Sequence, residues 1–90
     1  HFISEDGLVI IVINAGKRYA IDYTLDQLEE MLSPDDFFRI NRKVIIHISS
    51  IKKVSPYFNS RLKLNSDSLK DEECIVSRER VGDFKMWLDK

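Results

Sequence analysis

Residues 37–54 read FFRINRKVIIHISSIKKV, a polar cluster followed at once by an apolar run. In the cluster, three cations and an amide surround Ile40 between Arg39 and Lys43. The run from Val44 to Ile48 is interrupted only by His47, and its β-branched residues favour a strand. The stretch therefore predicts that a basic segment leads directly into an apolar strand.

The same stretch belongs to a longer basic region, residues 37–66, whose sequence contains no acidic side chain. Its seven cations are Arg39, Arg42, Lys43, Lys52, Lys53, Arg61 and Lys63. The whole chain still has a formal net charge of −1, because acids outnumber bases on both sides of this region. A folded surface with such a local excess attracts phosphates and repels cations. The alternative interpretation is an ordinary solvated basic face.

Before the basic region, the sequence predicts a β-hairpin and one short helix. Residues 8–13 are almost wholly β-branched and residues 17–23 alternate, so the two segments are expected to pair. Thr24 is expected to cap a helix over residues 24–32, with Gln27 completing a capping box. The expected buried stripe of this helix is Leu25, Leu28, Met31 and Leu32.

After the apolar run, the sequence predicts shorter strands and a second helix. Residues 51–54 indicate a short strand or turn, residues 55–59 an aromatic-containing turn, and residues 61–64 a strand with cations and leucines alternating. A strand end over residues 74–76 is followed by Ser77, the expected cap of a helix. That helix is expected to bury Val81, Phe84, Trp87 and Leu88. The predicted fold class is mainly β, a β-rich α+β domain with one or two short helices.

Composition is that of one domain over residues 1–90, with 43% apolar and 32% charged side chains. Cys74 is the single cysteine, so no internal disulfide can form, which fits a reducing, cytoplasmic compartment. No segment approaches the ~20 apolar residues of a membrane-spanning helix, so we expect no membrane association. Because the chain begins with His1 rather than Met, we expect a domain trimmed from a longer protein.

The sequence contains no motif for catalysis or metal binding. His1 and His47 are the only histidines, and with Cys74 they provide no zinc-ligand spacing. Cys74 and His47 would be a conceivable nucleophile and base, but a cysteine in an apolar strand is typically a buried hydrophobe. His47 is expected to be a hydrogen-bonded structural residue. The sequence therefore predicts a non-enzyme with no cofactor and no metal.

Four matches, in order along the chain, resemble the LytTR DNA-binding domain found at the C-termini of bacterial response regulators. They are YTLDQLEEML (23–32), FRINRKVIIHI (38–48) with Ile51 after it, VSRER (76–80) and DFKMWL (83–88). The resemblance covers nearly the whole chain, and the ordered series is more specific than any single match. The family's opening strand is expected to be shortened or absent before His1.

The resemblance implies an elongated fold of antiparallel strands that binds double-stranded promoter DNA through loops. These loops enter neighbouring major grooves, often at two imperfect repeats. Matched residue by residue, one loop falls on Arg39, Asn41, Arg42 and Lys43, and the other on Ser77, Arg78, Glu79 and Arg80. A third family contact falls near Asp6 and Gly7, where this sequence offers no obvious base-reading side chain.

Side-chain chemistry assigns expected roles to these residues. Arginine matches guanine and asparagine matches adenine in the major groove, so Arg42 and Asn41 are expected at base edges, with Arg78 or Arg80 second. Lys43, Lys52, Lys53, Arg61 and Lys63 are expected near phosphates. Two alternatives stay open: Arg39 pairs internally with Asp35 or Asp36, and Ser77 is a helix cap rather than a DNA contact.

This chain departs from the family pattern at Lys43-Val44, where the family usually has serine and an aromatic residue, and at His47, where it has asparagine. The hypothesis is sequence-specific DNA binding for transcription regulation, as the output domain of a two-component response regulator. By analogy, an N-terminal receiver domain would promote a homodimer. The rival interpretations are a protein-interaction module docking an acidic partner, and a single-stranded RNA binder that stacks bases on Tyr57 and Phe58.

Overall fold

The computed structural model of the chain describes residues 1–5, 7–13, 16–66 and 74–89. Within these residues there are eight strands and two α-helices. The strands are β1 (Phe2–Glu5), β2 (Leu8–Val12), β3 (Arg18–Ile21), β4 (Phe37–Asn41), β5 (Val44–His47), β6 (Lys53–Tyr57), β7 (Arg61–Asn65) and β8 (Ile75–Val76). The helices are α1 (Leu25–Met31) and α2 (Val81–Leu88), and 3₁₀ turns cover Ile48–Ser50, Phe58–Ser60 and Arg78–Arg80. This strand-rich architecture confirms the predicted fold class.

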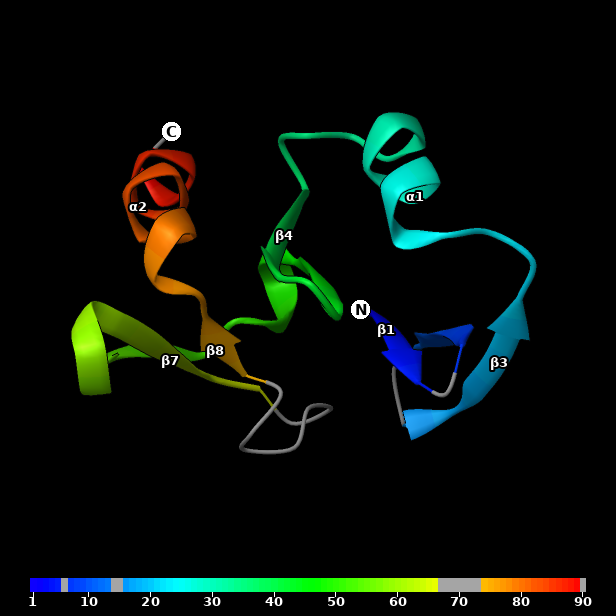
Figure 1. Cartoon of the computed structure of the whole chain (residues 1–90), viewed down its shortest axis with the longest axis horizontal. Helices are drawn as coiled ribbons and strands as arrows, with labels where there is room; N and C mark the ends of the chain where they lie inside the picture. Colours follow the sequence, from blue (N-terminus) through cyan, green and yellow to red (C-terminus); the bar gives the residue numbers. More distant parts are fainter. Residues whose placement is uncertain (6, 14–15, 67–73, 90) are drawn as a thin grey trace.

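Two antiparallel sheets organise the domain, and Figure 1 shows α1 and α2 on either side of β4. The first sheet has the order β3-β2-β1-β5-β4, and the second has the order β6-β7-β8. Strands β4 and β8 are edges of their sheets, and the Ser77 amide next to β8 donates to the Ile40 carbonyl of β4 at 2.9 Å. The domain measures 32 × 25 × 22 Å, so it is longer in one direction.

Both faces of the first sheet are covered at β5, which explains the apolar run in this strand. Ile45 packs in a cluster with Leu25 and Leu28 of α1. Its neighbours Val44 and Ile46 point the other way, into a second cluster that includes residues of α2. A strand that is buried on both faces has a continuous apolar sequence rather than an alternating one.

Strand β1 lies at the centre of the first sheet, although the sequence did not predict it. It pairs with β2 on one side and with β5 on the other. Phe2 and Ile3 are 7% and 2% exposed and belong to the two different core clusters. Four residues at the start of the chain contain too short a pattern for periodicity to reveal. The predicted hairpin is confirmed, because β2 and β3 pair antiparallel.

Helix α1 begins with the predicted capping box. The Gln27 amide donates to the Thr24 hydroxyl at 3.1 Å, and the Thr24 amide donates to the Gln27 side chain at 2.9 Å. Leu25 and Leu28 are buried as expected, but the prediction for Met31 is wrong, because 60% of this residue is exposed. The helix ends at Met31, and Leu32 after it is partly buried against the same cluster as Leu25 and Leu28.

Helix α2 buries its apolar side against the second cluster, as predicted. Phe84 is fully buried and Trp87 is 4% exposed, and the Trp87 indole donates to the Pro34 carbonyl at 2.8 Å. The helix begins at Val81, after a 3₁₀ turn, rather than directly at Ser77. The Ser77 hydroxyl is buried, makes no capping bond, and finds no partner among the described residues.

Candidate nucleic-acid interface

The turn between β4 and β5 consists of Arg42 and Lys43, and both side chains are exposed. Two-residue hairpin loops normally need positive φ angles. Neither Arg42 nor Lys43 has one; among described residues other than glycine, only Asn59 and Ser60 do. Instead, the register shifts between Arg39 and Asn41, as in a β-bulge, before the strands resume pairing. The conformation of this turn therefore needs support from side chains.

Asn41 supplies part of that support. Its side-chain oxygen accepts a hydrogen bond from the Lys43 amide at 2.8 Å, which closes an Asx-turn over Arg42. Its side-chain nitrogen donates to the Ile75 carbonyl of β8 at 2.8 Å. Asn41 thus folds the turn and fixes it to the second sheet with one side chain.

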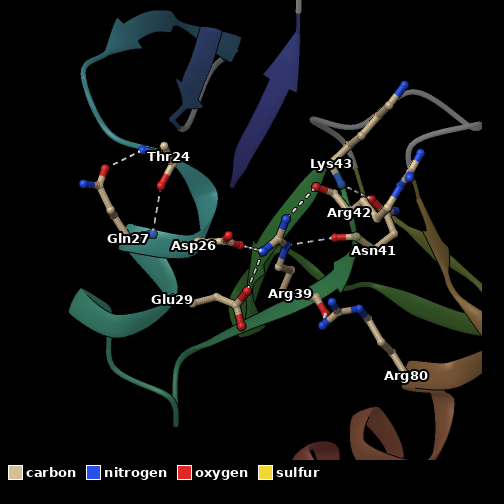
Figure 2. A network of polar contacts seen from close by, with 9 residues as sticks. All are labelled: Thr24, Asp26, Gln27, Glu29, Arg39, Asn41, Arg42, Lys43 and Arg80. Carbon is tan, nitrogen blue, oxygen red and sulfur yellow. Dashed lines mark hydrogen bonds and ion pairs between the residues drawn. The ribbon is translucent and has the colours of Figure 1, made fainter. Parts of the chain in front are cut away.

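Arg39 supplies the rest, and Figure 2 shows its guanidinium between α1 and the turn. One terminal nitrogen, Nη1, donates to the carboxylates of Asp26 and Glu29 on α1, the latter at 2.7 Å. The Nε atom donates to the Asn41 carbonyl at 3.3 Å, and Nη2 donates to the Arg42 carbonyl at 2.8 Å. Four of the five N–H groups of the fork are therefore used.

The electrostatic surroundings of Arg39 keep it charged. Burial acts to lower the pKa of Arg39, since its side chain is only 14% exposed. The hydrogen bonds and negative charges of Glu29 and Asp26 outweigh this effect and raise the pKa above its ordinary value. Arg39 is thus a permanent cation whose charge is largely balanced within the domain.

The structure corrects the expected location of two candidate residues. Arg39 and Asn41 were assigned to a loop by the resemblance, but both lie on β4 and their side chains are engaged within the domain. The internal partners of Arg39 are Asp26 and Glu29 rather than the expected Asp35 or Asp36. The sequence contained a signal for this pair: two acids at i, i+3 on one side of a predicted helix.

Three hydrogen bonds hold the β4–β5 turn close to the junction between β8 and α2. Besides the bond from Asn41 to Ile75, the Ser77 amide donates to the Ile40 carbonyl, and Arg80 donates to the Arg39 carbonyl at 3.4 Å. The two segments singled out in the sequence are therefore brought together, although they are more than thirty residues apart.

The side chains at this junction differ in their availability. Arg78 is exposed, whereas Arg80 is half-buried and Ser77 has its hydroxyl buried. Figure 2 shows Arg42 and Lys43 extending away from α1, while Arg80 reaches toward β4. None of the ion pairs among the described residues uses Arg42, Lys43 or Arg78. Asp6, near the third family contact, lies outside the described residues, and Gly7 has a φ of 81°.

Three of the five phosphate candidates share one face of the second sheet. Register places Lys53 opposite Asn65, Tyr57 opposite Arg61, and Ser55 opposite Lys63. These alternate positions point to the same side, away from the buried Leu64. Arg61 also donates to the Phe58 carbonyl at 3.0 Å and lies 5.1 Å from the centre of the Tyr57 ring. Lys52 is exposed and precedes β6.

Other kinds of site find little support in the described residues. Cys74 is 2% exposed within the core cluster, as predicted for a small hydrophobe. The Nδ1 atom of His47 accepts from the Ser49 amide at 3.1 Å and contacts the Ser49 hydroxyl at 2.7 Å, so it is a hydrogen-bonded residue, as expected. The described segments contain no cluster of three or more metal-ligating side chains and no helix suited to crossing a bilayer.

Comparisons with known proteins agree with this architecture. The chain is 30% identical over 69 residues to the transcriptional regulatory protein YpdB of Escherichia coli K12, a match covering 77% of this chain and 28% of that protein. It is 33% identical over 86 residues to the sensory transduction protein LytT of Bacillus subtilis, covering 94% of this chain and 34% of that protein. The chain thus spans about a third of these relatives or less.

A solved structure shares the fold. A LytTr DNA-binding domain from Bacillus cereus superimposes with a TM-score of 0.85 at 23% identity, covering 97% of this chain and 77% of that one. The family model of the LytTr DNA-binding domain matches residues 1–89. This family is defined by DNA binding rather than catalysis, in agreement with the expected non-enzyme. On this evidence, the chain belongs to the LytTr DNA-binding domain family.

Proposed function

We propose that this domain binds double-stranded DNA with sequence preference and so regulates transcription. Membership of the LytTr family supports this, and so does the relative named as a transcriptional regulatory protein. The observation that carries the proposal is the joining of two exposed basic segments. Hydrogen bonds hold the turn with Arg42 and Lys43 close to the junction that contains Arg78. Neighbouring loops whose cations take part in no ion pair among the described residues are suited to the major groove of one duplex.

Within this proposal, exposure and bonding divide the candidate residues by role. Arg42 and Arg78 read base edges, because their guanidinium forks take no part in the described ion pairs. Lys43 contacts phosphate beside them, and Lys52, Lys53, Arg61 and Lys63 contribute sequence-independent affinity. A second set supports the interface from within: Arg39, Asn41, Ser77 and Arg80.

We also propose what kind of longer protein contains this domain. We infer that the domain is the output domain of a cytoplasmic two-component response regulator, because its relatives are regulatory and sensory transduction proteins about three times its length. A receiver domain N-terminal to it would form a homodimer and place two output domains on promoter repeats.

A fluorescence anisotropy titration tests the proposal. The 90-residue chain is mixed with labelled duplex DNA, single-stranded DNA and RNA at two salt concentrations, after selection from random duplexes has supplied a cognate site. Tighter binding to the cognate duplex than to a scrambled one is expected. Equal affinity for both duplexes would contradict sequence preference. Absence of binding to every nucleic acid would favour the protein-interaction module instead.

A second candidate, single-stranded nucleic acid binding, is favoured by one feature. The tip of the β6–β7 hairpin exposes 74% of Phe58 beside Tyr57, with ring centres 5.1 Å apart. Exposed aromatic rings near cations form stacking surfaces for unpaired bases. In the same titration, tighter binding to single strands than to duplex, lost in Phe58→Ala, would favour this candidate.

A further inference from the structure

The side chain of Arg39 joins helix α1 to the turn that is proposed to face DNA. Figure 2 shows Arg39 reaching from β4 to Asp26 and Glu29 on one side and to the turn on the other. The carbonyls that it contacts there belong to Asn41, the last residue of β4, and to Arg42, the first residue of the turn. The guanidinium therefore bridges two parts of the fold rather than joining a simple ion pair.

The turn depends on such a bridge because its backbone lacks the positive φ angles that normally shape a two-residue hairpin loop. Arg42 and Lys43 have no positive φ, and the register is irregular just before them. Side-chain hydrogen bonds therefore determine how the turn is held. Asn41 fixes the amide side, through the Lys43 N–H, and Arg39 fixes the carbonyl side.

A purely stabilising ion pair would look different. Exposed ion pairs contribute little to stability, and the pair of Arg18 with Glu5, at 2.9 Å, is of this kind, with side chains 42% and 36% exposed. The side chains of Asp26 and Glu29 are also exposed, at 86% and 43%, but that of Arg39 is only 14% exposed. Its two contacts to main-chain carbonyls would be unnecessary for charge neutralisation. A planar guanidinium that makes four hydrogen bonds fixes the orientation of the groups it contacts and also supplies a positive charge. An ammonium group supplies the charge without fixing the orientation.

We propose that Arg39 is a positioning residue for DNA recognition, through which α1 sets the orientation of Arg42 and Lys43. The inference rests on the proposed function, because it assumes that this turn contacts DNA. In this arrangement α1 never touches the duplex. Its carboxylates hold the guanidinium, the guanidinium holds the turn carbonyls, and the turn presents its cations in one fixed direction.

The test is Arg39→Lys, which keeps the positive charge and removes the fork. Cognate affinity is expected to fall about 2- to 30-fold, the range found for residues that act through others, while affinity for a scrambled duplex stays unchanged. Amide hydrogen exchange at Arg42 and Lys43 should accelerate. Arg18→Lys is the matched control, because it changes an exposed arginine in an ion pair remote from this turn, and it should alter neither quantity.

A second variant tests the same inference if Arg39→Lys fails to fold. Asp26→Asn with Glu29→Gln removes the two carboxylates that bind Arg39, at exposed positions, and the same selective loss is expected. Glu30→Gln, on the same helix but outside the network, is its control. Equal losses on cognate and scrambled duplexes, or unchanged amide exchange, would overturn the positioning role. If the parent protein itself binds the cognate and the scrambled duplex equally, the proposed function has failed, whatever the variants do.

Discussion

Arg39 and Arg42 are three residues apart and have opposite environments. Arg39 is enclosed between α1 and the turn, whereas Arg42 is exposed and takes part in none of the described ion pairs. The sequence presented them as members of one basic cluster. It left open an internal ion pair for Arg39 but suggested the wrong acids, because those that hold Arg39 lie 13 and 10 positions earlier in the chain. Residue type therefore indicated the candidate region, and tertiary contacts divide the proposed roles within it.

Ser77 offers a prediction at the scale of one hydroxyl group. Its buried oxygen has no described hydrogen-bond partner, so Ser77→Ala should leave the free energy of unfolding unchanged or raise it by up to about 1 kcal/mol. DNA affinity should not change. Urea denaturation followed by Trp87 fluorescence measures the stability. Ser49→Ala is the control, since that hydroxyl contacts His47 at 2.7 Å and its removal should cost about 1 kcal/mol. A comparable loss in Ser77→Ala would show that its hydroxyl is bonded.

Among the elements, those defined by local signals were predictable from sequence. The capping box of α1 and the β2–β3 hairpin depend on residues that are close together in the chain. The extent of β4 depends on pairing with β5 and contact with β8, and β1 depends on two strands that come later. Such elements are fixed by partners distant in sequence, which periodicity within one segment cannot identify.

The capping box gives a prediction at the scale of one helix. Thr24→Ala removes the hydroxyl that accepts from the Gln27 amide, so the free energy of unfolding should fall by about 1 kcal/mol. Thr24→Ser keeps the acceptor and should remain within a few tenths of a kcal/mol of the parent. Chemical denaturation of the three proteins measures the difference. If Thr24→Ala and Thr24→Ser were equally stable, the cap would contribute nothing.

Across the whole molecule, charge is segregated rather than balanced locally. The net charge is −1, yet residues 37–66 contain seven cations and no acid. The fold places Lys53, Arg61 and Lys63 on one face of the second sheet. Of the six acids in residues 22–36, three precede or follow α1 closely, and two of the three in the helix neutralise Arg39. A weakly acidic domain can therefore still present a basic surface to a polyanion.

This segregation predicts how affinity responds to salt. Lys53→Ala should reduce the slope of log K against log salt by about one unit, equally for cognate and scrambled duplexes, because one phosphate contact is lost. Lys17→Ala is the control, since this exposed lysine precedes β3 at the far edge of the first sheet and should leave the slope unchanged. Anisotropy titrations over a series of salt concentrations provide the slopes. A slope in Lys53→Ala equal to that of the parent would remove this residue from the phosphate set.

The most direct test of DNA recognition by the β4–β5 turn is the affinity of Arg42→Ala for the selected cognate duplex and for a scrambled one. Loss of a bidentate base contact predicts that cognate binding weakens by about 1–3 kcal/mol and that selectivity relaxes at one base pair. Arg18→Ala, at the opposite edge of the first sheet, should bind as the parent does. Equal weakening on both duplexes, or no weakening on either, would contradict the account.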